Sequence, residues 1–119
     1  MKRILVVEDD TSIRELLVEI LEGEGYLVSA SKNGYEGIQS LETYIPDLIL
    51  MDVMMPIMDG YAFKNELLLN SEWRSIPVVA MSAQVQRKEK LADYGIVNFI
   101  SKPLDLGHLL ETLKNISPV

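Results

Sequence analysis

The stretch Leu48-Ile49-Leu50-Met51-Asp52 places a run of apolar residues directly before a carboxylate. A continuous apolar run of this length is typical of a strand that helices cover on both faces, as in a parallel sheet. A buried carboxylate costs free energy unless it is paired or has a function. The stretch therefore predicts a buried central strand with a functional aspartate, Asp52, standing alone at its end.

Outward from this strand, apolar runs of strand length alternate with segments of helical period. The predicted strands are Ile4–Val7, Leu27–Ala30, Leu48–Met51, Val78–Met81 and Asn98–Ile100. A first predicted helix carries residues 13–21, three more cover about residues 34–44, 61–70 and 84–94, and a last helix is entered at residue 105. This alternation predicts an α/β fold with an open, doubly wound, five-stranded parallel sheet and five helices.

The first helix carries the clearest helical pattern, because its apolar residues recur at i, i+3, i+4, i+7 and i+8. This stripe consists of Ile13, Leu16, Leu17, Ile20 and Leu21. Ser12 and Glu15 have the spacing of a capping box at its start. Gly23 or Gly25 can end the helix.

The last helix has a similar stripe, whereas the fourth helix lacks one. The stripe of the last helix consists of Leu106, Leu109, Leu110, Leu113 and Ile116. In the fourth helix only Val85, Leu91 and Ala92 can hold the segment against the sheet. With so few apolar contacts, we expect the fourth helix to be locally less stable than the others.

The composition limits the class of protein. The chain has 119 residues, 48% hydrophobic and 24% charged, which suits one soluble globular domain over residues 1–119. Its formal net charge of −7 argues against direct nucleic-acid binding, which needs a basic surface. The absence of cysteine excludes disulfides and thiolate metal sites. No stretch approaches the ~18 apolar residues of a membrane span, so we expect a cytoplasmic protein.

Polar residues gather where the predicted strands end. Glu8, Asp9 and Asp10 follow the first strand, Asp52 the third, Ser82 the fourth, and Ser101-Lys102-Pro103 the fifth. Ligands of open α/β sheets bind beyond the carboxyl ends of the strands. The fold therefore predicts that carboxylates, a hydroxyl and an ammonium group meet at one edge of the sheet.

This set of groups suits phosphoryl chemistry with a metal ion. Two like charges ~4 Å apart repel by about 4 kcal/mol at an effective dielectric constant of 20, so clustered carboxylates need a cation. Carboxylates without histidine or cysteine favour Mg²⁺. Lys102 and Ser82 can bind phosphoryl oxygens, and Asp52 can act as the nucleophile on phosphorus.

Five segments in order give the chain a family resemblance. They are Ile4-Leu5-Val6-Val7-Glu8-Asp9-Asp10, Asp47-Leu48-Ile49-Leu50-Met51-Asp52-Val53-Met54-Met55-Pro56, Met58-Asp59-Gly60, Ile76-Pro77-Val78-Val79-Ala80-Met81-Ser82-Ala83 and Ser101-Lys102-Pro103. Together they resemble the receiver domain of bacterial two-component response regulators, in register over essentially the whole chain. The resemblance implies a flavodoxin-like fold with strand order 2-1-3-4-5, similar to chemotaxis regulators. It also implies a cis peptide bond between Lys102 and Pro103.

The resemblance implies a role for each residue of the site. Asp52 would be the phosphoacceptor and Lys102 the phosphate-binding lysine. The metal ion, Mg²⁺ with Mn²⁺ able to substitute, would be held by Asp9, Asp52 and the backbone carbonyl of Met54, and by Glu8 through water. Ser82 would be the switch hydroxyl and Phe99 the switch aromatic residue. Such a domain catalyses only its own phosphorylation and dephosphorylation and is not otherwise an enzyme.

The resemblance also implies the partners. The phosphoryl donor would be a sensor histidine kinase or a histidine phosphotransfer protein. A downstream protein target or output domain would bind the surface of the fourth helix, fifth strand and fifth helix. The chain itself would be a monomer or a weak dimer.

Some residues depart from the commonest family pattern. Glu8 stands where many receivers have Asp, Ser82 where many have Thr, and Phe99 where many have Tyr. Met54 and Gln84 occupy positions where family members tune the loss of the phosphoryl group. These departures leave the lifetime of a phosphorylated state open.

Two other functions compete with this interpretation. An aspartyl-nucleophile, Mg²⁺-dependent phosphatase usually needs a second carboxylate two residues after the nucleophile, where this chain has Met54. A pseudo-receiver would bind partners without phosphorylation, but the complete set of acidic, hydroxyl and lysine groups argues against it.

Several residues near the motifs have a simpler structural explanation. Asp10 is expected to cap the first helix, and Asp59-Gly60 to form the turn into the third. His108 is expected to be exposed and Trp73 to anchor a loop. The methionines are expected to pack in the core and its lid, namely Met51, Met54, Met55, Met58 and Met81.

Overall fold

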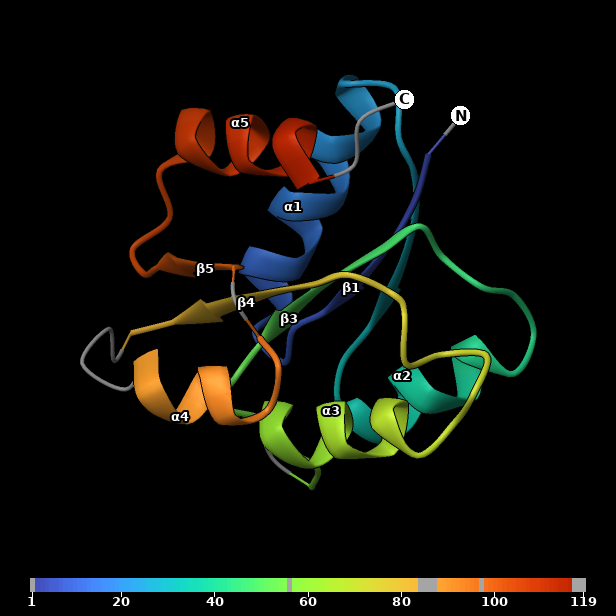
Figure 1. Cartoon of the computed structure of the whole chain (residues 1–119). Coiled ribbons are helices and arrows are strands. Elements are labelled where there is room, and N and C mark those ends of the chain that lie inside the picture. The colour runs from blue at the N-terminus through green and yellow to red at the C-terminus, as the bar shows by residue number, and fades with distance from the viewer. Residues whose placement is uncertain (1, 56, 84–87, 97, 117–119) are drawn as a thin grey trace.

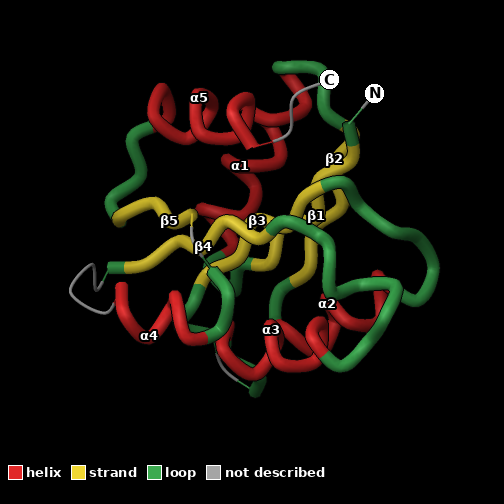
Figure 2. Tube along the Cα trace, viewed as in Figure 1, coloured by secondary structure: helices red, strands yellow, loops and turns green. Residues whose placement is uncertain are grey.

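A computed structural model describes residues 2–55, 57–83, 88–96 and 98–116. The chain forms a five-stranded parallel sheet with the order β2-β1-β3-β4-β5. Helices α1 and α5 cover one face of this sheet, and α2, α3 and α4 cover the other (Figures 1 and 2). The predicted doubly wound α/β fold and its strand order are therefore confirmed.

Each strand is one residue longer than the sequence pattern predicts. The strands are β1 (Arg3–Val7), β2 (Leu27–Ser31), β3 (Leu48–Asp52), β4 (Val78–Ser82) and β5 (Asn98–Ser101). The apolar pattern misses the last residue of most strands because that residue is polar. As a result Asp52 and Ser82 close their strands instead of following them, and sheet pairing fixes their backbones.

The helices differ from the prediction mainly at their ends. They are α1 (Thr11–Gly23), α2 (Gly34–Leu41), α3 (Gly60–Leu68), α4 (Lys88–Asp93) and α5 (Leu106–Ile116). Helix α2 stops before Tyr44, because the chain turns at Thr43, whose hydroxyl donates to the carbonyl of Ser40 at 2.9 Å. The predicted start of the fourth helix, at residues 84–87, lies outside the described residues.

The N-terminal cap of α1 is Asp10 and not Ser12. The Asp10 carboxylate accepts a hydrogen bond from the backbone N–H of Ile13 at 2.9 Å. Asp10 has an extended backbone, and the helix already begins at Thr11, so Ser12 lies inside the first turn. The capping box predicted from Ser12 and Glu15 was wrong, whereas the capping role predicted for Asp10 is confirmed.

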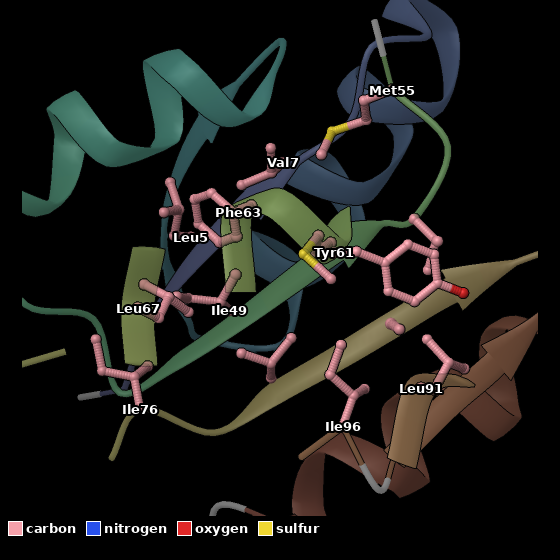
Figure 3. Packing of buried hydrophobic residues seen from close by; sticks show 14 of the residues in the cluster. Leu5, Val7, Ile49, Met55, Tyr61, Phe63, Leu67, Ile76, Leu91 and Ile96 are labelled. Carbon is pink, nitrogen blue, oxygen red and sulfur yellow. The ribbon is translucent and has the colours of Figure 1, made fainter. Parts of the chain in front are cut away.

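Side chains that alternate along the strands build a core on each face of the sheet. The first cluster, which we call the α2–α4 core, is packed by residues such as Leu5, Ile49, Phe63, Leu67 and Leu91 (Figure 3). The second, the α1/α5 core, includes Ile4, Leu50, Leu17, Leu21 and Leu113. A central strand such as β3 is thus buried on both faces, as its continuous apolar run predicts.

Two residues that the sequence pattern placed in the core are exposed. Leu16 in α1 is 45% exposed, because the helix presents its buried face through Leu17 and Leu21. Ala92 in α4 is exposed, so of the predicted anchors Leu91 is buried and Val85 lies outside the described residues.

Helix α4 is also held by aromatic contacts from α3. The Lys90 ammonium group lies 4.3 Å from the ring centre of Tyr61, and the Tyr61 and Tyr94 ring centres are 5.0 Å apart. Such contacts were not visible in the apolar pattern of the helix. The reduced stability of this helix stays a prediction.

Gly60 lets the start of α3 approach β3 closely. A Cβ atom on Gly60 would lie 2.8 Å from Val53 Cα and 3.2 Å from the carbonyl oxygen of Asp52. The Gly60 N–H also donates to the Val53 carbonyl at 2.8 Å. Because backbone atoms occupy the space, any side chain here would push α3 away from the loop that follows Asp52.

We predict that Gly60→Ala lowers the free energy of unfolding by about 2 kcal/mol, since a packed backbone must move to admit the methyl group. Urea unfolding followed by circular dichroism measures this change. Gly23→Ala is the matched control, because among the described residues nothing beyond its own stretch of helix lies within 4 Å of where its Cβ atom would stand. That variant should be neutral or slightly more stable, and equal losses in both variants would contradict the close-approach argument.

Candidate functional site

Three carboxylates meet where β1 and β3 end. Oxygen atoms of Glu8, Asp9 and Asp52 all lie within 4.8 Å of one another. Glu8 is fully buried, Asp52 is 5% exposed, and Asp9 is exposed. The structure therefore brings together the acidic residues that the sequence placed at separate strand ends.

Lys102 joins this acidic cluster from the end of β5. Its ammonium group donates to Asp52 Oδ2 at 2.9 Å and to Glu8 Oε1 at 3.1 Å. The backbone N–H of Lys102 donates to the Ser82 carbonyl at 2.9 Å, which ties the lysine to β4. The peptide bond between Lys102 and Pro103 is cis, as the resemblance implied.

The charges of the site are only partly balanced. If all groups ionise, three carboxylates lie together, and the Lys102 ammonium group pairs with two of them, Glu8 and Asp52. Burial raises the pKa of Glu8 from 4.5 to about 7, and the charge of Asp52 adds to this rise, while hydrogen bonds from Asp10 and Lys102 oppose it. Burial alone lowers the pKa of Lys102, but its bonds and charge contacts with Asp52 and Glu8 together outweigh burial and raise it. The site favours additional positive charge.

Asp52 is held in place on both sides. Its Oδ1 accepts a hydrogen bond from the backbone N–H of Met54 at 3.1 Å, and its Oδ2 binds Lys102. The side chain is 7% exposed, which leaves a small opening at the protein surface. The carboxylate is thus oriented by groups that donate hydrogen bonds to it.

Arg14 supports the acidic loop, a role that the sequence pattern did not reveal. Its Nη1 donates to the carbonyl of Glu8 at 2.9 Å and to that of Asp9 at 3.3 Å. The sequence placed Arg14 only on the polar face of α1. An arginine near a helix N-terminus is unfavourable because its charge opposes the helix dipole. That unfavourable position was the one feature of the sequence that could have indicated a specific role for Arg14.

The remaining predicted residues lie around the cluster. Ser82 is buried at the end of β4, and Phe99 is half-buried in β5 and packs against the α2–α4 core. Ala80 is the register partner of Phe99, so the two predicted switch residues lie on neighbouring strands. Gln84 lies outside the described residues.

The simpler explanations are confirmed with one exception. Asp59 caps α3 by accepting from the Ala62 N–H at 2.9 Å, His108 is exposed, and Trp73 packs against the α2–α4 core. Met54 does not pack in the core, because its side chain is 61% exposed beside the acidic cluster. The backbone N–H of Met54 donates to Asp52, and in this position its side chain points into solvent.

An apolar groove borders the site. It has a volume of about 530 Å³ and is lined by Ile13, Leu16, Ala83, Lys102, Pro103, Leu104 and Leu106. Lys102 lines the groove and also bonds to Asp52. The exposed Leu16 side chain is thus part of an apolar surface next to the site.

The family is shown by sequence comparison. The sequence model of the family described as the response regulator receiver domain matches residues 4–114. The chain belongs to this family, and the resemblance drawn from its motifs is confirmed. It is accordingly a signalling domain of the kind found in two-component regulatory systems, in which receivers are not classical enzymes.

Curated relatives differ in length. The chain is 34% identical over 116 residues to KdpE, the KDP operon transcriptional regulatory protein of Escherichia coli K12, covering 96% of this chain and 50% of KdpE. It is 32% identical over 116 residues to the polar-differentiation response regulator DivK of Brucella anthropi, covering 96% and 94% of the two chains. The chain thus spans about half the length of KdpE.

Solved structures share the fold. The chemotaxis response regulator CheY4 of Vibrio cholerae superposes with a TM-score of 0.92 at 27% identity, covering 98% of both chains. The response regulator TrrA of Thermotoga maritima, solved in complex with Mg²⁺-BeF, superposes with a TM-score of 0.86 at 29% identity, covering 98% of this chain and 99% of TrrA.

Within the part of the chain that the structure describes, no helix has the length and apolar character needed to cross a membrane.

We predict that Glu8→Gln stabilises the metal-free protein at pH 8. Because Glu8 has a raised native pKa, it keeps its proton in the folded state while the unfolded chain releases it, so stability falls as pH rises from 4.5 to about 7. A neutral glutamine removes this loss, on the order of 2 kcal/mol. Urea unfolding in EDTA at pH 4.5 and pH 8 measures it.

Glu111→Gln is the control for this measurement, because Glu111 is exposed on α5. It should leave the pH dependence unchanged. If the stability of the wild type and of Glu8→Gln changed equally between pH 4.5 and pH 8, the pKa of Glu8 would not be raised in the folded protein, and the prediction would be wrong.

Proposed function

We propose that the chain is a phosphoacceptor receiver domain over residues 1–119, in which Asp52 accepts a phosphoryl group in a Mg²⁺-dependent reaction. The observation that carries this proposal is the geometry at Asp52, whose buried carboxylate lies against two other carboxylates and the ammonium group of Lys102. A carboxylate that acted without a metal ion would not need two further carboxylates and an ammonium group beside it.

The donor set fits a hard divalent cation. Glu8, Asp9 and Asp52 offer only oxygen atoms, and these atoms lie within 4.8 Å of one another. Carboxylate oxygens without histidine or cysteine suit Mg²⁺, for which Mn²⁺ can substitute. Asp9, Asp52 and the Met54 carbonyl would hold the ion, with Glu8 acting through water. When bound, the ion would neutralise charge on the transferring phosphoryl group.

Three residues of the chain take part in the phosphoryl transfer. A carboxylate oxygen of Asp52 forms a bond to phosphorus while the bond from phosphorus to a histidine nitrogen of the donor breaks, which leaves an acyl phosphate and a free imidazole. Lys102, already within 2.9 Å of Asp52, binds a phosphoryl oxygen as a point charge. The N–H of Met54 keeps the carboxylate oriented during the attack.

The acyl phosphate then changes the state of the domain. Ser82, at the end of β4, donates its hydroxyl to a phosphoryl oxygen, and its movement opens space for Phe99 to turn inward. Contacts that exist only with the phosphoryl group shift the population between two arrangements. The surface of α4, β5 and α5 changes as a result and binds the downstream target or output domain.

The donor is a sensor histidine kinase or a histidine phosphotransfer protein in the cytoplasm. A protein donor needs a surface beside the acceptor, and the apolar groove that Lys102 shares with Ile13 and Leu16 provides one. The domain acts as a monomer or a weak dimer and binds neither nucleic acid nor membrane directly.

We predict that incubation with Mg²⁺ and acetyl phosphate adds the mass of one phosphoryl group, and that Asp52→Asn abolishes this gain. Intact-protein mass spectrometry measures it, with EDTA as the metal control. Asp47→Asn is the matched variant, because Asp47 is an exposed aspartate that directly precedes β3, at the opposite end of the strand from Asp52. A mass gain that survives in Asp52→Asn, or steady multiple turnover of simple phosphate esters, would refute the proposal.

We predict that Lys102→Met slows this phosphorylation roughly 100-fold, because the ammonium group no longer stabilises charge on the phosphoryl group. The rate of mass gain at saturating Mg²⁺ measures the effect. Lys114→Met on α5 is the control and should react at the wild-type rate, because Lys114 is exposed on a separate helix. An unchanged rate in Lys102→Met would show that Lys102 does not contribute to the phosphorylation of Asp52.

A further inference from the structure

The β2 edge of the sheet has unpaired backbone groups. Strand β2 pairs only with β1, and the pairing uses the Leu27 N–H and the Ser31 carbonyl, at 2.9 and 3.0 Å from their partners. Alternate residues of a parallel pair face opposite neighbours, so the N–H and C=O groups of Val28 and Ala30 point to the open side. Across residues 2–55, 57–83, 88–96 and 98–116, nothing hydrogen-bonds to these outward groups.

The edge also lacks the usual protection against strand addition. Exposed edge strands commonly carry lysine, proline or a bulge that discourages a further strand. Strand β2 reads Leu-Val-Ser-Ala-Ser and carries neither charge nor proline. Leu27 is 49% exposed and Ala30 is exposed as well. This edge is therefore available to an extended segment.

A groove follows the β2 edge. One hollow of about 330 Å³ lies between α1 and β2, where Val18 and Ala30 line it. A second hollow of about 270 Å³ is lined by Arg3, Leu27, Val28, Ser29 and Tyr44, and the Arg3 guanidinium group lies 5.6 Å from the centre of the Tyr44 ring. Both hollows are lined by Glu22, so they adjoin each other along the strand. Val18, Leu27 and Val28 give the groove apolar lining among its polar residues.

The helix wall of this groove is acidic. Glu15, Glu19 and Glu22 all line it, and their spacing of four and three residues places them on one face of α1. Within the described ranges, none of the three forms an ion pair. Two arginines also line the groove. The Arg14 guanidinium group donates to the carbonyls of the acidic loop, and the Arg3 guanidinium group lies over the Tyr44 ring in the second hollow.

We propose that the β2 edge binds an extended, basic segment of a partner protein, which adds to the sheet as a sixth strand. Its backbone would bond to Val28 and Ala30, as in known strand-addition complexes. Side chains alternate along a strand, so every second one would face the glutamates of α1 and the others would face Leu27 and Tyr44. The fitting segment alternates lysine or arginine with apolar residues.

A second copy of the chain does not fit this edge. Pairing β2 with another β2 would bring two acidic walls together, each with Glu15, Glu19 and Glu22, in a chain of net charge −7. Like charges at an interface oppose association. The charge pattern thus selects a basic partner. The site lies on α1 and β2 and uses none of the residues proposed for phosphorylation.

The probe is a short peptide of alternating lysine and valine, titrated into ¹⁵N-labelled protein. We expect slower hydrogen exchange at the amides of Val28 and Ala30, and affinity that falls as salt is raised. The same peptide with glutamate in place of lysine should not bind. Perturbed amides confined to another surface, or equal binding of both peptides, would overturn the proposal.

Two variants separate the backbone and the charge contributions. Ala30→Pro removes an outward N–H that β1 does not use, and we expect binding about fivefold weaker. The combined change Glu15→Gln, Glu19→Gln and Glu22→Gln should weaken binding about tenfold without touching the strand, so it keeps the test valid if the proline variant fails to fold. Wild-type affinity in the glutamine variant would overturn the proposal.

Sedimentation and phosphorylation complete the test. The wild-type chain should not dimerise through β2, and a dimer that Ala30→Pro abolishes would show that the occupant is a second copy. Acetyl phosphate labelling of Asp52 should be the same in the glutamine variant and the wild type. A labelling defect there would contradict the separation of this edge from the phosphoacceptor site.

Discussion

The ammonium group of Lys102, shared between Glu8 and Asp52, is the interaction on which the site depends. It joins residues that are 94 and 50 positions apart in the chain. The parallel sheet carries the ends of β1, β3 and β5 to one edge and so brings these residues within hydrogen-bonding distance. Without the lysine, buried carboxylates would repel each other at close range, and Glu8 would lose the partner of its buried Oε1 atom.

The rest of the fold holds the loops around this interaction. Gly60 lets α3 approach the backbone after Asp52, and Arg14 binds the carbonyls of Glu8 and Asp9. Both contacts hold segments that carry the clustered carboxylates, whose burial and mutual repulsion cost free energy. A protein retains such groups where function needs them, at some cost to stability. The excess negative charge that remains favours an additional cation at this end of the sheet.

The site and the β2 edge use different properties of one sheet. The carboxyl ends of the central strands concentrate ionisable side chains, whereas β2 offers backbone groups and a partly apolar groove beside the acidic face of α1. The first surface suits small, highly charged groups. The second suits an extended chain, because regular spacing of backbone donors and acceptors recognises another strand.

The sequence by itself determined the succession of strands and helices along the chain, the buried central strand and the carboxylates that end the strands. These follow from apolar periodicity and from which side chains end each strand, whereas the order of strands in the sheet came from the family resemblance. The sequence misjudged details that depend on neighbours distant in the chain. Leu16 and Met54 are apolar yet exposed, and Asp10 rather than Ser12 caps α1. Tertiary structure alone decided that Arg14 binds the acidic loop and that Lys102 contacts both carboxylates. Those contacts depend on how loops from separate strands meet in space, and no local pattern encodes that distance.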